Sequence, residues 1–222
     1  MHGLFKRLER RTPTLRAVRI LFAGATGVLG RATLPHLRRH HIVGLTRSNE
    51  KRNLLRRLGV EGAVCDVYDH DGLLSVAERL RPDTVVNFVT DLAAGSAAAN
   101  NRARREGGAN LLAVASAAGA ARLVVESVAF TLEGDAQQAV EQLERSARAF
   151  SRDAIILRFG RLWGPGTRHR ERPAPPTIHI DEAGVRAAHL IACGAPGTYT
   201  IADAPARRPS IGGSTFRYRH VA

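Results

Sequence analysis

Lysine is almost absent from this chain, and cysteine is scarce. Only Lys6 and Lys51 are lysines, so any chemistry that needs a lysine after position 51 is excluded. Cys65 lies at the end of a predicted strand, and Cys193 lies at the end of a predicted helix. This separation favours reduced, buried thiols of a cytoplasmic protein over a disulfide framework. No apolar run approaches the length of a membrane span, and the basic N-terminal segment lacks the apolar core of a signal peptide.

Basic residues, by contrast, are abundant, and the formal net charge is +13. Such a charge is typical of nucleic-acid-binding proteins. The arginines are spread over nearly every predicted helix, however, and aromatic residues make up only 5% of the chain. This pattern favours a solvated surface over a nucleic-acid groove. The basic stretches 6–11 and 207–219 are the exceptions, and they keep nucleic-acid binding as the least favoured alternative.

Residues 20–30 read Ile-Leu-Phe-Ala-Gly-Ala-Thr-Gly-Val-Leu-Gly, an apolar strand that runs into a glycine-rich turn and a helix. Gly24 permits the tight turn, Gly27 lets the backbone approach a pyrophosphate, and Gly30 permits close packing of helix on strand. The first free amides of the helix then face the phosphates. The order of strand, turn and helix therefore predicts a dinucleotide site.

Apolar segments alternate with helical patterns along the rest of the chain, which is typical of β-α-β units and a parallel sheet. The predicted strands are 18–22, 41–46, 62–65, 84–89, 123–126, 154–158 and 198–201. The predicted helices are 28–39, 51–58, 73–80, 101–118, 136–150 and 181–192, the last with Asp181 as its N-cap. Residues 160–176 are predicted to form a loop.

A length of 222 residues suffices for one full α/β core. We therefore expect a doubly wound, Rossmann-type parallel sheet in residues 18–203. A basic extension (1–17) would precede it, and a disordered basic tail (204–222) would follow it.

Several short blocks make the chain similar to a known family. They are the glycine turn (24–30), Asp66, Pro-Asp-Thr-Val-Val-Asn (82–87), Arg-Glu-Gly-Gly-Ala-Asn-Leu-Leu (105–112), Leu-Arg-Phe-Gly-Arg-Leu-Trp-Gly-Pro-Gly-Thr (157–167) and Ile-His-Ile-Asp-Glu-Ala (178–183). In this order they resemble the extended short-chain dehydrogenase/reductase superfamily, specifically NAD-dependent epimerase/dehydratase-like proteins of the atypical kind. The resemblance covers about residues 18–203.

The resemblance implies cofactor-binding roles at several strand ends. The residues implied to line the pyrophosphate are Gly24, Thr26, Gly27, Val28, Leu29 and Gly30. Asp66 would contact the adenine, with Val67 beside it, although Asp66 also fits a plain turn residue. The residues implied to flank the ribose and the nicotinamide are Phe88, Val89 and Thr90. They follow the fourth strand, at the edge where an open parallel sheet binds its ligand.

The end of the second strand bears on the choice of cofactor. An acidic residue there would hold the ribose 2′-hydroxyl of NAD, whereas an arginine suits the 2′-phosphate of NADP. The strand ends at Arg47 and Ser48, with no acid before Glu50. Arg47 offers a planar fork of donors and Ser48 a further donor, so NADP is preferred over NAD. The alternative is that Arg47 is one more solvated arginine.

The residues that usually carry the chemistry of this superfamily are missing. Members use a tyrosine for proton transfer and a lysine four residues later. Counted from Glu144, which matches a frequent glutamate of the family, these positions hold Ala136 and Val140, and neither side chain transfers a proton. Ser127 matches the active-site serine and would hydrogen-bond a carbonyl. Arg104 replaces a frequent asparagine, which puts the family's water relay in doubt.

The substrate-binding part is also short. Only residues 168–177 separate the Gly-Pro-Gly loop from the His-Ile-Asp block, which leaves no room for a lid, so we expect a much reduced C-terminal lobe.

Two functions remain open: an NAD(P)-dependent oxidoreductase or epimerase with a non-standard acid, and a regulatory protein that senses NADP(H) without turnover. The resemblance also implies a homodimer. No metal site is expected, because His36 and His40 lack a third ligand.

Overall fold

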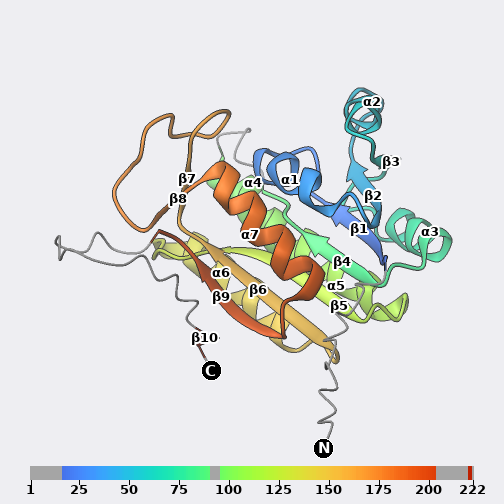
Figure 1. Ribbon diagram of the computed structural model, residues 1–222. Coiled ribbons are helices and arrows are strands. Elements are labelled where there is room, and N and C mark those ends of the chain that lie inside the picture. The colour runs from blue at the N-terminus through green and yellow to red at the C-terminus, as the bar shows by residue number, and fades with distance from the viewer. Residues whose placement is uncertain (1–16, 91–95, 204–219, 222) are drawn as a thin grey trace, which may run out of the picture.

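The computed structural model describes residues 17–90, 96–203 and 220–221. The strands of its main sheet are β1 (Arg19–Ala23), β2 (His41–Thr46), β3 (Glu61–Val64), β4 (Thr84–Asn87), β5 (Arg122–Val128), β6 (Asp153–Phe159), β9 (Gly197–Ile201) and β10 (His220–Val221). They lie in the order β10-β9-β6-β5-β4-β1-β2-β3, and every neighbouring pair is parallel except β9 and β10 (Figure 1). The expected doubly wound parallel sheet is confirmed.

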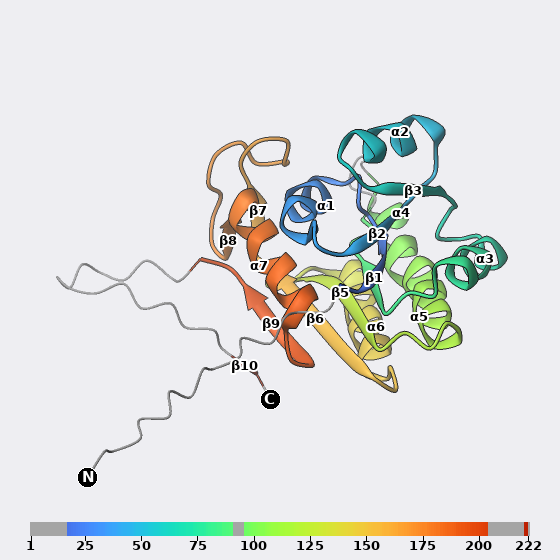
Figure 2. The ribbon, with the colours of Figure 1, turned by 45° about the vertical axis from the view of Figure 1, so that its right-hand side comes forward.

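Helices cover both faces of this sheet (Figures 1 and 2). They are α1 (Val28–Thr33), the 3₁₀ turn η1 (Leu34–Leu37), α2 (Asn49–Arg57), α3 (His70–Leu80), α4 (Ala97–Arg102), the π-helical turn η2 (Ala103–Gly107), α5 (Gly108–Ala117), α6 (Gly134–Arg148) and α7 (Ile180–Cys193). Helix α7 packs beside α1 on one face, and α3, α5 and α6 pack on the other. The strand order reverses between β1 and β4, so a crevice is expected at their carboxyl ends.

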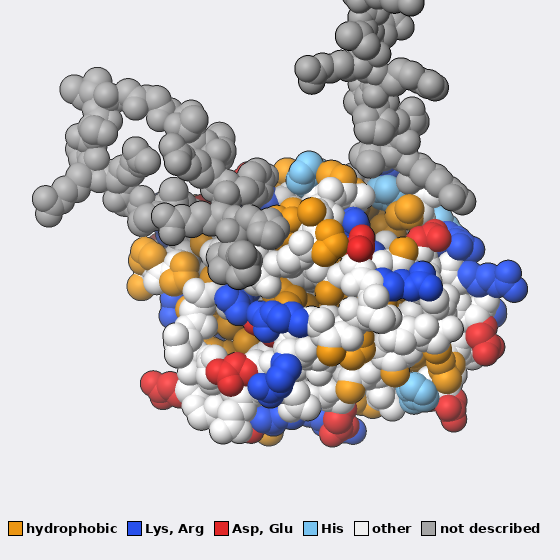
Figure 3. Space-filling view, turned by 90° about the horizontal axis from the view of Figure 1, so that it is seen from below, with side chains coloured by type: hydrophobic (Ala, Val, Ile, Leu, Met, Phe, Trp, Pro, Cys, Tyr) orange, Lys and Arg blue, Asp and Glu red, His pale blue; other side chains and the backbone are white. Residues whose placement is uncertain are grey.

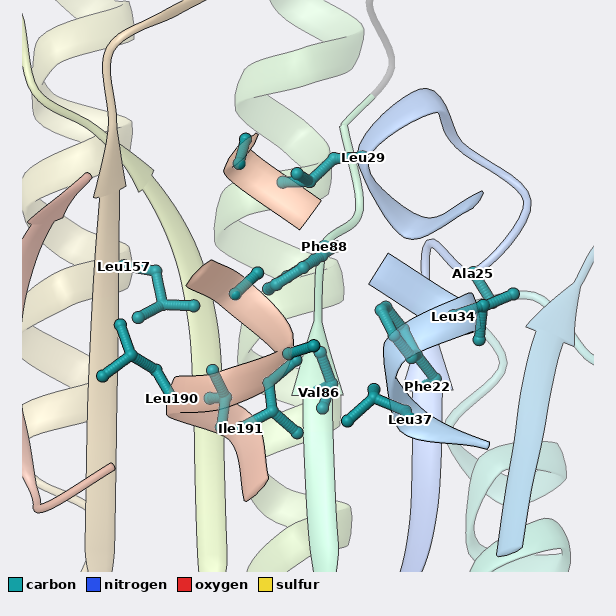
Figure 4. Packing of buried hydrophobic residues seen from close by; sticks show 14 of the residues in the cluster. Phe22, Ala25, Leu29, Leu34, Leu37, Val86, Phe88, Leu157, Leu190 and Ile191 are labelled. Carbon is teal, nitrogen blue, oxygen red and sulfur yellow. The ribbon is translucent and has the colours of Figure 1, made fainter. Parts of the chain in front are cut away.

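The core consists of two layers of apolar side chains, one on each face of the sheet. Strand β1 contributes to both: Ile20 and Phe22 lie in the layer under α1 and α7, and Leu21 and Ala23 lie in the layer under α3 and α5. All four are fully buried, as expected of a strand covered on both sides. Figure 4 shows Phe22 among the labelled residues of the first layer, next to Leu37 of η1.

The predicted helices differ from the structure at their ends, and two of these differences have a clear local cause. The helix predicted for 28–39 becomes 3₁₀ after Thr33, because Pro35 has no N–H to donate to the preceding turn. Helix α2 starts two residues earlier than predicted, because the Ser48 hydroxyl accepts a 3.3 Å hydrogen bond from the Lys51 amide and caps it.

Three further predictions need correction. The helix predicted for 101–118 starts at Ala97 and contains the π-helical turn η2. The loop predicted for 160–176 contains β7 (Arg161–Trp163), which pairs in parallel with β8 (Thr177–His179). The N-cap of α7 is His179, whose ring Nδ1 accepts from the Asp181 amide, rather than Asp181 itself. Such pairings depend on partners that local periodicity does not reveal.

The predictions for the two ends and the cysteines have different outcomes. Residues 1–16, 204–219 and 222 lie outside the described part of the chain. The two described residues near the C-terminal end, His220 and Val221, form β10.

Cys65 and Cys193 are both free thiols. Cys65 is buried as predicted, whereas Cys193 is exposed because it ends α7 on the solvent side. Over the described residues, no helix is long and apolar enough to cross a membrane.

The surface seen in Figure 3 carries charges of both signs. Lysine and arginine side chains are interspersed with acidic and apolar ones over this face, rather than gathered into one patch. Many of the arginines are held by acids, as in the pairs Arg19–Asp83, Arg102–Glu106 and Arg186–Glu182. The high net charge is therefore dispersed on this face, which agrees with the interpretation of a solvated surface.

Candidate functional site

The glycine turn between β1 and α1 lies at the point where the strand order reverses. Gly24 has φ +87°, and a Cβ built on it would collide with the carbonyl oxygen of Phe88 on the adjoining strand end. A Cβ at Gly30 would collide with the carbonyl oxygen of Gly24. Both positions therefore require glycine. Gly27 donates a 3.0 Å hydrogen bond to the Gly24 carbonyl and is exposed, so its backbone is open to a ligand.

The other predicted pyrophosphate residues divide by exposure. Thr26 and Val28 are half-buried at the outer side of the turn, where their side chains reach solvent. Leu29, by contrast, turns its side chain into the core under α7 (Figure 4). Only the backbone of Leu29 faces the turn. The structure thus brings this group together around the start of α1, with the side chain of Leu29 turned away into the core.

Arg47 and Ser48 follow β2, two strands from the reversal point along the same edge. Arg47 is exposed, and Ser48 is half-buried. The Ser48 hydroxyl oxygen caps α2 by accepting a hydrogen bond from the Lys51 amide. The hydrogen of the same hydroxyl can still be donated to another group. An exposed arginine at the end of β2 is the arrangement that suits a ribose 2′-phosphate.

Asp66 and Val67 follow β3. One carboxylate oxygen of Asp66 accepts a 3.1 Å hydrogen bond from the Tyr68 amide, and the Asp66 carbonyl accepts from the Asp69 amide at 3.0 Å. Asp66 therefore shapes the turn into α3, which is the alternative role noted for it. Val67 is buried, and its carbonyl accepts a 2.9 Å hydrogen bond from the Asn110 side chain.

Phe88, Val89 and Thr90 continue β4 at the same edge. Phe88 is only 3% exposed, and its ring meets Phe22 edge-on at 5.2 Å and Phe159 at 6.1 Å. Its side chain thus belongs to the core, and its carbonyl is the part that reaches the glycine turn. Val89 is half-buried against the apolar layer under α3 and α5, and Thr90 is exposed at this edge.

Ser127 lies near the end of β5 in a buried polar network. Its hydroxyl donates a 2.6 Å hydrogen bond to Glu144 of α6. The same carboxylate accepts from the guanidinium groups of Arg148 and Arg158. Burial raises the pKa of Glu144, but the hydrogen bonds from these three side chains outweigh it and hold the pKa below its usual range. Ser127 is placed at the predicted edge, but its proton is committed to a carboxylate.

No described tyrosine takes the place of the missing acid. Ala136 lies half-buried in the first turn of α6, and Val140 is buried in the core. The Tyr199 hydroxyl donates to the Ala195 carbonyl at the far side of the sheet, and the Tyr68 ring lies under Arg102 at 4.0 Å, beside β3. Tyr218 lies outside the described residues.

Glu126, which is not among the predicted site residues, lies at this edge, and the charge of Arg104 acts on it. Glu126 precedes Ser127 in a strand that is otherwise mainly apolar, and it is partly buried. Burial raises the pKa of Glu126 to about 7, against the opposing charge of Arg104. Burial in turn lowers the pKa of Arg104, which the charge of Glu126 partly offsets. A lone acid in an apolar strand is the signal that would have identified Glu126.

The small β7–β8 unit borders the turn. A Cβ at Gly166 would lie 3.8 Å from Val28, and a hollow of about 390 Å³ is lined by Gly164, Pro165, Gly166 and Arg170. The Trp163 ring meets the His179 ring edge-on at 4.6 Å. This unit is the reduced C-terminal lobe. A larger hollow of about 650 Å³ lies at the opposite edge of the sheet, beside Arg81 and Pro82, and none of the predicted site residues lines it.

Comparisons with known proteins bear on the family and the fold. The model of the NAD-dependent epimerase/dehydratase family matches residues 20–130, half of the chain. A 3-diazoavenalumate denitrifying reductase from a Streptomyces species is 33% identical, and the match covers 68% of this chain and 58% of that protein. The chain thus spans less than two thirds of this relative's length.

Solved structures share the fold at low sequence identity. The NAD complex of the Bordetella bronchiseptica enzyme WbmG superposes with a TM-score of 0.71 at 17% identity, covering 86% of this chain and 74% of that one. The NAD complex of the UDP-glucose 4-epimerase of Thermus thermophilus superposes with a TM-score of 0.68 at 16% identity, covering 83% and 77%. With the family match and the glycine turn at the strand reversal, the chain belongs to the NAD-dependent epimerase/dehydratase family.

Proposed function

We propose that this protein binds NADP(H), in preference to NAD(H), and acts as a reductase. The observation that carries the proposal is the glycine turn at the strand reversal. A side chain at Gly24 would collide with the Phe88 backbone, whereas Gly27 leaves its backbone open. This cradle of bare backbone fits a pyrophosphate. When bound, the dinucleotide supplies a hydride to the substrate.

Each strand end then has a task of its own. The turn at Gly27 holds the pyrophosphate, and Asp66 with Val67 borders the adenine. Arg47 holds the 2′-phosphate with its planar fork of donors. Val89 and Thr90 line the space for the ribose and the nicotinamide. The reductase activity in the printed name of the Streptomyces relative supports hydride transfer as the reaction.

A calorimetric titration with NADPH and, separately, NADH tests the binding proposal. We expect tighter binding of NADPH. Because a charge-assisted hydrogen bond contributes about 1.5–3 kcal/mol, Arg47→Ser should weaken NADPH binding about tenfold or more and leave NADH binding nearly unchanged. Arg79→Ser removes an exposed arginine at the end of α3, far from this edge, and serves as the control. Tighter binding of NADH by the unaltered protein would contradict the preference.

A non-catalytic NADP(H) sensor is the second candidate. The missing tyrosine and lysine and the short lobe favour it. The test is oxidation of NADPH by the protein across a panel of carbonyl substrates. Turnover would eliminate the sensor. Binding without any turnover, together with a cofactor-dependent change in a partner's affinity, would favour it over the reductase.

A further inference from the structure

Glu126 lies beside the reversal point of the sheet. Strand β5 pairs with β4 through Asn87 and Val125, so Glu126 is the first residue past that pair, next to Phe88. On its other side it pairs with Leu157 of β6. Phe88 is the residue whose carbonyl abuts Gly24. Glu126 is therefore one strand away from the glycine turn, at the carboxyl edge where the ligand of such a sheet binds.

The direction of the side chain follows from strand alternation. Val124 belongs to the same apolar layer as Phe88 and Leu157, and residues two apart in a strand face the same side. Glu126 thus projects on that side, and Ser127 projects toward α6, where it meets Glu144. The two neighbouring polar residues of β5 face opposite sides of the sheet.

The carboxyl groups of Glu126 and Glu144 differ in the hydrogen bonds that they accept. Glu144 accepts hydrogen bonds from three side chains, whereas no described residue donates one to Glu126. Arg104 is 8% exposed and donates none to a described residue either. The fully enclosed side-chain atoms without a partner, over the described residues, belong to His40, Asn101 and Trp163. The unpaired atoms of Glu126 and Arg104 therefore retain contact with solvent.

We propose that Glu126 is the group that exchanges a proton with the substrate in this site. This inference depends on the proposed function. For a carbonyl substrate, the carbon takes a hydride from the reduced dinucleotide, and the C=O π electrons move to oxygen. That oxygen takes the proton from the Glu126 carboxyl group, whose O–H bond breaks, and water returns a proton to the carboxylate afterwards.

The acid strength of Glu126 suits this task. Its carboxyl group has a pKa of about 7, raised by burial and opposed by Arg104. A group with a pKa near the working pH is the most effective general acid and base, because both forms are populated. Of the elements packed beside it, β4 and β6 present Phe88 and Leu157, which do not titrate. The positive charge of Arg104, from η2, opposes the effect of burial.

The first test is a titration of the carboxyl groups by NMR on protein labelled at glutamate. We expect one glutamate to titrate near pH 7, and its signal to be lost in Glu126→Gln but kept in Glu78→Gln, a matched change at an exposed position of α3. Arg104→Gln should move this midpoint upward, because it removes the charge that lowers the pKa. A Glu126 midpoint within the ordinary glutamate range would overturn the proposal.

The second test is the pH dependence of NADP⁺ binding to the whole protein. The oxidised nicotinamide ring carries a positive charge that attracts a carboxylate, so affinity should rise about threefold or more between about pH 6 and pH 8. Binding to Glu126→Gln should keep only the smaller rise near pH 6 that ionisation of the 2′-phosphate causes, since a phosphate monoester has a second pKa of about 6. Binding to Glu78→Gln should follow the unaltered protein. Equal pH dependence in Glu126→Gln would overturn the proton-exchange role alone. Absence of NADP⁺ and NADPH binding in the unaltered protein would overturn the proposed function as well.

Discussion

The Ser127 hydroxyl donates a 2.6 Å hydrogen bond to Oε1 of Glu144, and both residues are only 3% exposed. The guanidinium of Arg158 donates to the same oxygen at 2.7 Å. The carboxylate of Glu144 thus joins α6 to both β5 and β6. In this arrangement the serine proton is donated to a negative charge. Ser127 therefore has a structural partner, and its role as an active-site donor stays a prediction.

Ser127→Ala should lower the free energy of unfolding by about 1–2 kcal/mol, because a buried hydrogen bond to a charged group is lost. Dinucleotide affinity should not change. Denaturant unfolding and calorimetry measure the two effects. Ser116→Ala removes an exposed hydroxyl that bonds only to the Leu112 carbonyl within α5, and it should change stability little. Loss of turnover at unchanged stability would instead restore a catalytic role for Ser127.

Glu144→Gln should destabilise the protein by about 2 kcal/mol at neutral pH, because the charge-assisted hydrogen bonds from Ser127, Arg148 and Arg158 lose their acceptor charge. The pKa of Glu144 is lowered in the folded state, since its hydrogen bonds outweigh the effect of burial. Its contribution is therefore present above the unfolded-state pKa and is lost as the pH falls through the folded-state pKa. Unfolding measured from neutral to acid pH should show a smaller acid loss in the variant. Parallel curves for the two proteins would contradict this linkage.

Gly24→Ala should cost more than about 3 kcal/mol of stability and abolish dinucleotide binding, because the new Cβ would press on the Phe88 backbone from a residue with positive φ. Gly59→Ala is the matched control, since Gly59 has φ +75° but nothing within 4 Å of its Cβ position. It should cost about 1 kcal/mol, the strain of the left-handed conformation alone. Thermal unfolding of both variants separates the steric effect from the conformational one. Equal losses would show that the contact with Phe88 carries no weight.

The two thiols should differ in reactivity. Cys65 is buried, and burial together with the charges of Asp69 and Asp66 raises its pKa to about 11. Cys193 is exposed at the end of α7. Because the thiolate is the reactive form, a maleimide at mildly alkaline pH should modify Cys193 quickly and Cys65 only on unfolding. Mass spectrometry of the time course counts the modified thiols, and Cys193→Ser should remove the fast phase.

Local patterns were enough to predict most of the sheet. The strand predicted for 41–46 matches β2 at both ends, and the other strands of the parallel sheet differ by a few residues. Short apolar runs bounded by glycine and proline indicate where each of these strands begins and ends. The β7–β8 pair was missed, since each strand is only three residues long and each pairs with the other in a separate small sheet. The π-helical turn at Arg104 and the exposure of Cys193 likewise depend on what packs nearby.

The sequence by itself determined the order of elements, the glycine turn and the absence of the tyrosine and lysine, because these depend on residue identity and short spacings. Tertiary structure alone decided which polar groups meet. Residues 127 and 144 pair across β5 and α6, while Glu126 faces the other side of the sheet with Arg104 as its charge partner. Burial and the distance between charges set proton affinity, and both arise only when segments far apart in the chain are brought together.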